Sequence, residues 1–222
     1  LKKPITLPTD SLYLLELFKE KIKFKAERPK FTGSNHITFG YQSDLDSLPK
    51  IRLLSVVDSL WSFTEKVADK DSLNFWFKAP SKMDSLRFTV AGANSIDTFT
   101  VKPVGGLAKD TLTFAMRSKS SLAPNQSVFF RSSTPLKAID TALIAFVESD
   151  SIKLPALLKM QADARTLTLD FNPKPEGSYR LSMLPGAIQD YFEQTNDSLS
   201  FRFNMTPIED FGTLKFELEN AK

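Results

Sequence analysis

The sequence predicts an all-β chain built as two consecutive antiparallel β-sandwiches, and three observations support that prediction. Apolar and polar residues alternate over many short segments, as they do in half-buried strands. A short phrase, Asp followed by Ser or Thr and then an apolar residue, opens one run after another. Turn-forming Pro and Gly residues fall about every ten residues. Many short strands at that spacing are typical of a sandwich or barrel rather than of a parallel α/β fold.

The alternation is strict enough to assign faces. In residues 199–205, Leu199, Phe201, Phe203 and Met205 lie on one face and polar residues lie on the other. A period of two over such a run predicts an antiparallel strand with its apolar side inward. The same pattern occurs in residues 37–41, 73–77, 86–90, 112–116, 167–171, 179–183 and 214–218.

Two segments depart from this pattern. Residues 142–147 are apolar on both faces, which predicts a central strand covered on both sides. Residues 187–194 are the best candidate for a helix, and they would form a turn or two at most. The chain is therefore expected to contain almost no helix.

The recurring Asp phrase has a physical basis in turn chemistry. An Asp carboxylate can accept a hydrogen bond from the backbone N–H two residues on, and the apolar run that follows fits a pleated surface. We therefore expect an Asx turn before each of these strands. The phrase stands at Asp10, Asp46, Asp58, Asp71, Asp84 and Asp197, with variants after Asp97, Asp110, Asp140 and Asp150.

A chain of 222 residues can hold two sandwiches of about 100 residues each. The strongest boundary is residues 103–109, where Pro103 is followed by the only Gly-Gly pair, Gly105 and Gly106. We place one domain at 1–103 and the other at 107–222. Because so short a link keeps its domains close together, we expect a fairly fixed two-domain rod.

Composition excludes several classes of function. The net charge of +3 comes from interspersed acids and bases, so no nucleic-acid partner is expected. The absence of cysteine excludes disulfides, thiol catalysis and Cys-ligated metals. No apolar run approaches the roughly 18 residues that a membrane span needs. The chain begins at Leu1 without a signal peptide, and we interpret it as a piece excised from a longer protein.

Candidate chemistry is sparse. His36 is the only histidine, so acid–base or Ser-His-Asp catalysis would have to use it; the competing interpretation, an exposed turn or edge histidine, is favoured. The 26 acids could supply a glycosidase pair, but most stand in turns or point outward from strands. Calcium could bind the carboxylate pairs Asp44/Asp46 or Asp69/Asp71, although neither continues into an EF-hand loop. The sequence predicts no catalytic residue, cofactor or metal.

Aromatic residues offer a further possibility. Trp76 lies between Phe75 and Phe77 and so on the opposite face of their strand. It is a candidate for an exposed aromatic platform, or for a residue that packs against a neighbouring domain. Trp61 is in phase with Phe63 and is expected in the core.

The closing part of the chain resembles a known module. It contains a Gly-x-Tyr strand that includes Tyr179, followed by a turn that runs from Gly186 to Asp190. It ends in a Phe-x-Phe strand formed by Phe201 and Phe203. This pattern resembles the bacterial Ig-like module of S-layer proteins and of Gram-negative cell-envelope lipoproteins. The opening half of that module is echoed in residues 128–135 and 142–144, so the resemblance covers about 125–205. Residues 1–103 resemble the β-rich regions that accompany such modules.

The sequence departs from the module at one point. The Gly-Asn pair that usually follows the turn Asp is replaced by Tyr191 and Phe192, so the turn must close differently. The resemblance implies an Ig-like second sandwich in an exported, lipid-anchored protein, whose partners would be neighbouring domains of the same longer chain and a protein or glycan at the envelope.

These observations lead to a functional hypothesis. The chain is expected to be a non-enzymatic structural or interaction module, a spacer or scaffold of an exported cell-envelope protein associated with the outer membrane, the cell surface or the periplasm. The alternative is a carbohydrate- or protein-binding sandwich that uses its loops or the face of Trp76. An enzyme is disfavoured because no base–nucleophile pair or metal set can be assembled.

Overall fold

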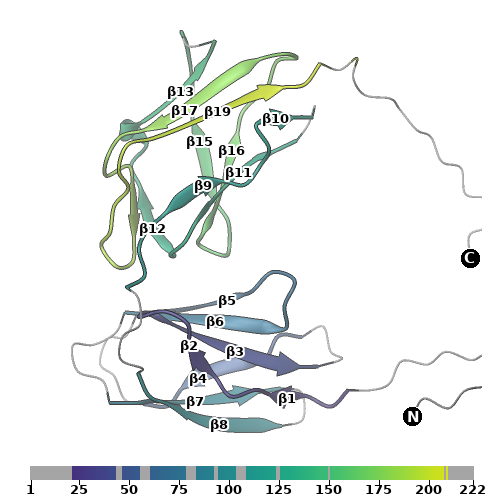
Figure 1. The fold of residues 1–222 in the computed structure, drawn as a ribbon, viewed down its shortest axis with the longest axis vertical. Helices are drawn as coiled ribbons and strands as arrows, with labels where there is room; N and C mark the ends of the chain where they lie inside the picture. The colour runs from purple at the N-terminus through teal and green to yellow at the C-terminus, as the bar shows by residue number, and fades with distance from the viewer. Residues whose placement is uncertain are drawn as a thin grey trace, which may run out of the picture.

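The computed structural model describes residues 22–43, 47–55, 61–78, 84–92, 95–103, 109–123, 126–149, 151–207 and 209. These residues form nineteen β-strands and one short 3₁₀ helix, arranged in two blocks of sheets (Figure 1). The predicted all-β fold of two antiparallel sandwiches is confirmed. Within these ranges no helix is long and apolar enough to cross a membrane.

The first sandwich consists of two antiparallel sheets. One has the order β1-β3-β6-β5, with β2 also paired to β3, and the other has the order β4-β7-β8. With β1 and β2 counted together as strand A, these are the A-B-E-D and C-F-G sheets of an immunoglobulin domain. The bounds are β1 Lys25–Ala26, β2 Lys30–Phe31, β3 His36–Gln42, β4 Lys50–Leu53, β5 Ser62–Lys66, β6 Ser72–Phe77, β7 Leu86–Ala91 and β8 Ile96–Val101.

The second sandwich has the same plan with additions. Its sheets have the orders β15-β16-β11-β9 and β10-β19-β17-β13-β14, which correspond to D-E-B-A and A′-G-F-C-C′. The bounds are β9 Phe114–Met116, β10 Ser121–Leu122, β11 Val128–Ser132, β13 Ile144–Glu148, β14 Ile152–Leu154, β15 Leu157–Met160, β16 Thr166–Asp170, β17 Ser178–Met183 and β19 Leu199–Met205.

A short ribbon is inserted between these strands. It pairs β12 (Leu136–Ile139), which lies between strands B and C, with β18 (Ile188–Asp190), which lies between strands F and G. The 3₁₀ helix Thr141–Leu143 follows β12, and the Asp140 carboxylate caps it by accepting a hydrogen bond from the Ala142 N–H at 3.0 Å. At Asp140 the expected Asx geometry is therefore confirmed.

A local feature of immunoglobulin domains supports the assignment of strand F. Tyr179, at the start of β17, is 2% exposed, and its hydroxyl accepts a hydrogen bond from the Lys174 backbone N–H at 2.7 Å. This is the geometry of a tyrosine corner. A Cβ at Gly177 would lie 2.4 Å from that hydroxyl, so the corner needs a glycine there.

Each sandwich has its own hydrophobic core. In the first, Ile37, Phe39, Phe75, Phe77 and Phe88 are among the buried residues. In the second, the core includes Phe130, Phe146, Leu181, Phe203 and Met205. The predicted faces of residues 37–41, 86–90, 167–171 and 179–183 are confirmed, because their alternate apolar residues are buried or pack against these cores.

Two other predictions have different outcomes. The helix expected in residues 187–194 is wrong, because Ile188–Asp190 forms strand β18 and a turn follows it. The strand expected in residues 214–218 lies outside the described residues. So do residues 104–108 of the proposed link, and the boundary between 1–103 and 107–222 stays a prediction.

Candidate interaction site: the joint between the two sandwiches

Polar and aromatic side chains from the two blocks of sheets meet where one end of the second sandwich lies against the outer face of a sheet of the first (Figure 1). Figure 1 shows the end of the second sandwich that carries β12 facing the sheet that carries β5 and β6. We call this contact the joint. It comprises Ser34, Asn35, His36, Trp61, Glu65, Trp76 and Lys78 of the first sandwich, and Asp110, Arg131, Asp163, Arg165, Tyr191, Phe192, Glu193 and Gln194 of the second.

A buried carboxylate lies at the centre of the joint. Glu65 on β5 is only 5% exposed, and Arg165 of the second sandwich donates a hydrogen bond to its Oε1. The same oxygen accepts hydrogen bonds from Trp76 Nε1 at 3.2 Å and from Asn74 Nδ2 at 3.3 Å. An ionised carboxylate is costly to bury unless it is paired and hydrogen-bonded. The position of Glu65 is therefore tied to the position of the second sandwich.

The guanidinium of Arg165 contacts the first sandwich with its flat face as well as with an N–H group at its edge. Its guanidinium carbon lies 5.3 Å from the centroid of the Trp76 ring, which is a cation–π arrangement. Its Nε donates to the Ser132 carbonyl at 3.1 Å, which fixes the side chain on its own sandwich. One arginine thus binds a carboxylate and covers a tryptophan that is itself only 2% exposed.

Asp163 supports this arginine from the loop between β15 and β16. Its carboxylate accepts hydrogen bonds from the backbone N–H groups of Arg165 and Thr166, at 3.0 and 2.8 Å, and pairs with Arg131 Nη1 at 2.7 Å. Burial raises the pKa of Asp163, but hydrogen bonds from Thr166 and Arg165 and the charge of Arg131 outweigh burial and lower the pKa below 3.8. Arg131 Nη2 in turn lies 3.8 Å from Glu65 Oε2.

A second polar cluster joins the start of the second sandwich to the loop before β3. Asp110 Oδ2 accepts hydrogen bonds from the Asn35 N–H at 2.7 Å and from the Ser34 hydroxyl at 3.2 Å, and Oδ1 lies 3.3 Å from His36 Nδ1. Burial raises the pKa of Asp110, yet these contacts outweigh burial and lower the pKa below 3.8. A Cβ on Gly33 would lie 2.2 Å from Asp110 Oδ1, so the close approach needs glycine.

Stacked aromatic rings form the third part of the joint. Trp61 lies against Tyr191 with ring centroids 4.0 Å apart and an interplanar angle of 17°. Phe192 contacts Trp61 edge-on at 5.9 Å and Trp76 at 6.3 Å. The His36 ring stacks on Trp76 at 4.2 Å. Such ring pairs add stabilisation beyond the area that they bury, and they restrict relative rotation.

The turn after β18 presents Tyr191 and Phe192 to the first sandwich. The buried Asp190 carboxylate accepts hydrogen bonds from the N–H groups of Phe192 and Gln194 at 2.9 and 2.8 Å, and from the Thr134 hydroxyl at 2.8 Å. Here the turn closes without the Gly-Asn pair of the module that the sequence resembles. The departure that the sequence showed at Tyr191 and Phe192 thus supplies two of the aromatic contacts of the joint.

The structure corrects several expectations about these residues. His36 was expected to be exposed, but its side chain is 15% exposed because it lies between Trp76 and Asp110. Trp61 was expected in the core, but it is half-buried against Tyr191. Trp76 is not an exposed platform; the competing prediction, packing against the other sandwich, is confirmed. Sequence reasoning missed Glu65 and Arg165 because they are 100 residues apart.

The calcium hypotheses receive no support from the geometry. Asp44 and Asp46 lie outside the described residues. Asp69 and Asp71 are exposed in the turn between β5 and β6, and Asp69 has a φ of 56°. Within the described ranges no group of three or more His, Asp or Glu side chains is placed to hold a metal ion. What the joint can do chemically is hold two sandwiches together, because each of its carboxylates is paired with a cation or accepts hydrogen bonds.

Comparison with known proteins adds only distant structural likenesses. No family model and no curated protein matches the chain. A chimeric titin Z1Z2 structure matches over 83% of this chain and 97% of its own, with 12% identity and a TM-score of 0.29. Domains 5–6 of the S-layer protein SbsC match over 83% and 99%, with 8% identity and a TM-score of 0.34. Tandem Ig repeats of Dlar match over 82% and 96%, with 10% identity and a TM-score of 0.26. At TM-scores this low the matches say nothing about function.

Proposed function

We propose that the chain is a non-enzymatic spacer or scaffold whose two domains, 1–103 and 107–222, are held at a fixed angle. The single observation that carries this proposal is the bond between Glu65 and Arg165, buried beside Trp76 and made between the two sandwiches. A buried ion pair of this kind forms in one geometry only, since any rotation would leave a charge without its partner.

The composition of the joint supports a fixed angle over a flexible link. Domains on flexible links have few directional contacts with each other. Here the turn after β18 contacts the first sandwich through the stacking of Tyr191 on Trp61. The same turn is held on its own sandwich by Gln194, whose Nε2 donates to the Asp110 carbonyl at 2.7 Å and whose Oε1 accepts from the Leu112 N–H at 3.1 Å. Lys78 also pairs with the exposed Glu193 at 2.6 Å.

The cellular setting of the proposal is the cell envelope of a bacterium. Its support is the resemblance of residues 125–205 to the Ig-like module of envelope proteins. The tyrosine corner and the strand order of the second sandwich support only the Ig-like fold that this resemblance implies. The partners would then be neighbouring domains of a longer exported chain. The carbohydrate-binding alternative loses its aromatic platform, because Trp76 is buried against Arg165.

Small-angle scattering of the full chain tests the proposal. We expect one extended shape to fit the whole profile, and we expect the same profile at low and high salt and with or without calcium. The variant Arg165→Glu serves as the disrupted comparison. It places a second carboxylate against Glu65 and should broaden the distribution of domain angles. A wild-type profile that requires a broad ensemble would contradict the fixed-angle spacer.

A further inference from the structure

The two sandwiches differ at the edge where strand G ends. In the second sandwich, β10 pairs in parallel with β19, with Leu122 opposite Met205. Backbone hydrogen bonds of 2.8 Å from Asn204 N to Ser120 O and from Thr206 N to Leu122 O extend that pairing. In the first sandwich both β1 and β2 pair with β3, and within the described residues β8 pairs only with β7. The outer edge of β8 is therefore open in this part of the chain.

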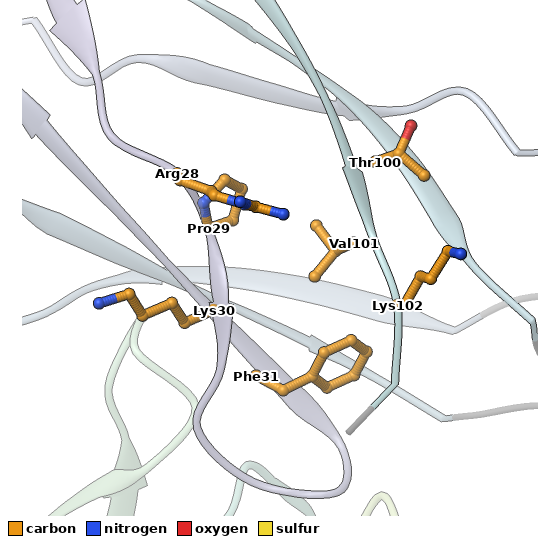
Figure 2. Close-up of a pocket in the computed structure, with 7 residues that line it drawn as sticks. All are labelled: Arg28, Pro29, Lys30, Phe31, Thr100, Val101 and Lys102. Atoms are coloured by element: carbon orange, nitrogen blue, oxygen red, sulfur yellow. The ribbon is translucent and has the colours of Figure 1, made fainter. Parts of the chain in front are cut away.

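An open pocket of about 560 Å³ lies at this edge, between the segment that includes β2 and the end of β8. Figure 2 shows Phe31 and Val101 facing the gap from opposite sides, so the pocket has apolar walls. The guanidinium of Arg28 extends across the gap towards Val101, whereas the Lys30 side chain points away from it. The lining residues are Arg28, Pro29, Lys30, Phe31, Thr100, Val101 and Lys102.

We propose that this edge binds an extended acidic segment of a partner protein, which adds to β8 as a further strand. The proposal goes beyond the spacer function and does not depend on it. Strand addition to an exposed sheet edge uses backbone hydrogen bonds for affinity and alternate side chains for specificity. The second sandwich shows the same addition within this chain, since β10 occupies the corresponding edge of β19.

The backbone of β8 supplies the first half of the recognition. In an antiparallel pair the N–H and C=O groups of every second residue point away from the partner strand. β8 is six residues long, Ile96–Val101, and it pairs with β7 over its whole length. Its alternate backbone groups therefore point to the outer edge, where an incoming strand can pair with them.

Charge supplies the second half and selects an acidic partner. Arg28 and Lys102 are exposed on the two sides of the pocket, and within the described residues neither forms an ion pair with a carboxylate. Residues of an added strand alternate between two faces. Apolar residues of the partner would rest on Phe31 and Val101, and its carboxylates would meet Arg28 and Lys102 at the sides of the pocket (Figure 2).

A peptide titration tests the proposal with the full chain. The probe is a fluorescein-labelled peptide of alternating Val and Glu, matched in length to the six residues of β8. Fluorescence anisotropy measures its affinity for the wild-type chain, for the Arg28→Glu/Lys102→Glu variant and for Lys30→Glu. Lys30→Glu is the matched control because it changes the same charge on the same segment, but on a side chain that points away from the pocket.

The expected result has three parts. The Arg28→Glu/Lys102→Glu variant weakens binding by about tenfold or more, whereas Lys30→Glu changes it by less than about threefold. A peptide with alternate backbone nitrogens methylated fails to bind, because it cannot pair with a strand edge. Hydrogen exchange of β8 amides slows when the unmodified probe is added.

Three outcomes would overturn the proposal. Equal binding of the methylated peptide would reduce the interaction to charge attraction without strand addition. If Lys30→Glu weakened peptide binding as much as Arg28→Glu/Lys102→Glu does, the peptide would be bound outside the pocket. Slow exchange of all β8 amides before any peptide is added would mean that another segment or a second copy of the chain already covers the edge.

Discussion

The interior of the second sandwich and the joint hold this chain together by different means. In the interior, Phe146, Phe171, Tyr179 and Phe203 form a cluster with ring centroids 5.0 to 6.2 Å apart. In the joint, aromatic rings pack beside charged groups: Arg165 covers Trp76 and is hydrogen-bonded to Glu65. Apolar burial stabilises without direction, whereas charged hydrogen bonds demand one geometry. The interior therefore decides whether the sandwich folds, and the joint decides how the two sandwiches are oriented.

The largest expected effect lies in the interior. Phe203 is 1% exposed and packs against Phe146, Phe171 and Tyr179. Phe203→Ala removes these contacts and leaves a cavity, so we expect the free energy of unfolding to fall by about 3–5 kcal/mol. Urea unfolding followed by circular dichroism measures this loss.

The neighbouring residue on the opposite face of β19 provides the control. Arg202 is exposed, and Arg202→Ala should change the free energy of unfolding by less than about 0.5 kcal/mol. Similar losses for Phe203→Ala and Arg202→Ala would mean that the register of β19 is wrong.

A smaller loss of stability, with a larger change of shape, is expected at the joint. Glu65→Ala leaves Arg165 without its carboxylate at a site where that arginine is only 15% exposed. We expect unfolding to become easier by about 3 kcal/mol and the scattering profile to broaden. Glu65→Gln keeps an acceptor for Trp76 Nε1 and should lose less. An unchanged profile for Glu65→Ala would show that the apolar contacts alone fix the angle.

The aromatic part of the joint should couple two residues from different sandwiches. Trp61 and Tyr191 stack at 4.0 Å, so the effects of Trp61→Ala and Tyr191→Ala should not be additive. A double-mutant cycle on the free energy of unfolding should give a coupling of about 1 kcal/mol. A coupling indistinguishable from zero would mean that the two rings are not in contact in solution.

Acid should weaken the joint before it weakens the interior. The pKa values of Asp110 and Asp163 are lowered below 3.8 in the folded chain, so their contribution to stability is present above pH 3.8 and is lost as the pH falls through the lowered values. Scattering profiles recorded from neutral pH down to pH 3 or so should broaden at the acid end. Asp110→Asn and Asp163→Asn together should remove that acid-dependent broadening, whereas a profile that broadens equally in this double variant would assign the effect to other carboxylates.

The sequence predicted the interior far better than the joint. The alternation that begins at Leu199 assigns Phe203 and Met205 to the core, because a period of two fixes which side of a strand each residue faces. The same argument was only partly successful for Trp76. It placed the ring opposite Phe75 and Phe77, but it could not choose between solvent and the neighbouring sandwich.

Asp140 and Asp110 show where local reasoning stops. Both stand in the same Asp-Thr phrase. The Asp140 carboxylate accepts a hydrogen bond from the N–H two residues on, as the phrase predicts. The Asp110 carboxylate instead accepts hydrogen bonds from Asn35 and Ser34, 75 and 76 residues away. A turn is decided within a few residues, whereas the partners of Asp110 are brought to it only by the packing of one sandwich against the other.

By itself the sequence determined the fold class, the faces of most strands and the turn at Asp140, because periodicity and turn chemistry depend on residues that are near neighbours in the chain. Only the tertiary structure decided that His36 is covered, that Trp61 lies in the joint, that Glu65 pairs with Arg165 and that the edge of β8 is open in the described residues. These features depend on which surfaces of two sandwiches, each with its own core, meet. Packing between segments that are distant in the chain determines which surfaces meet. Such packing leaves no periodic pattern in the sequence.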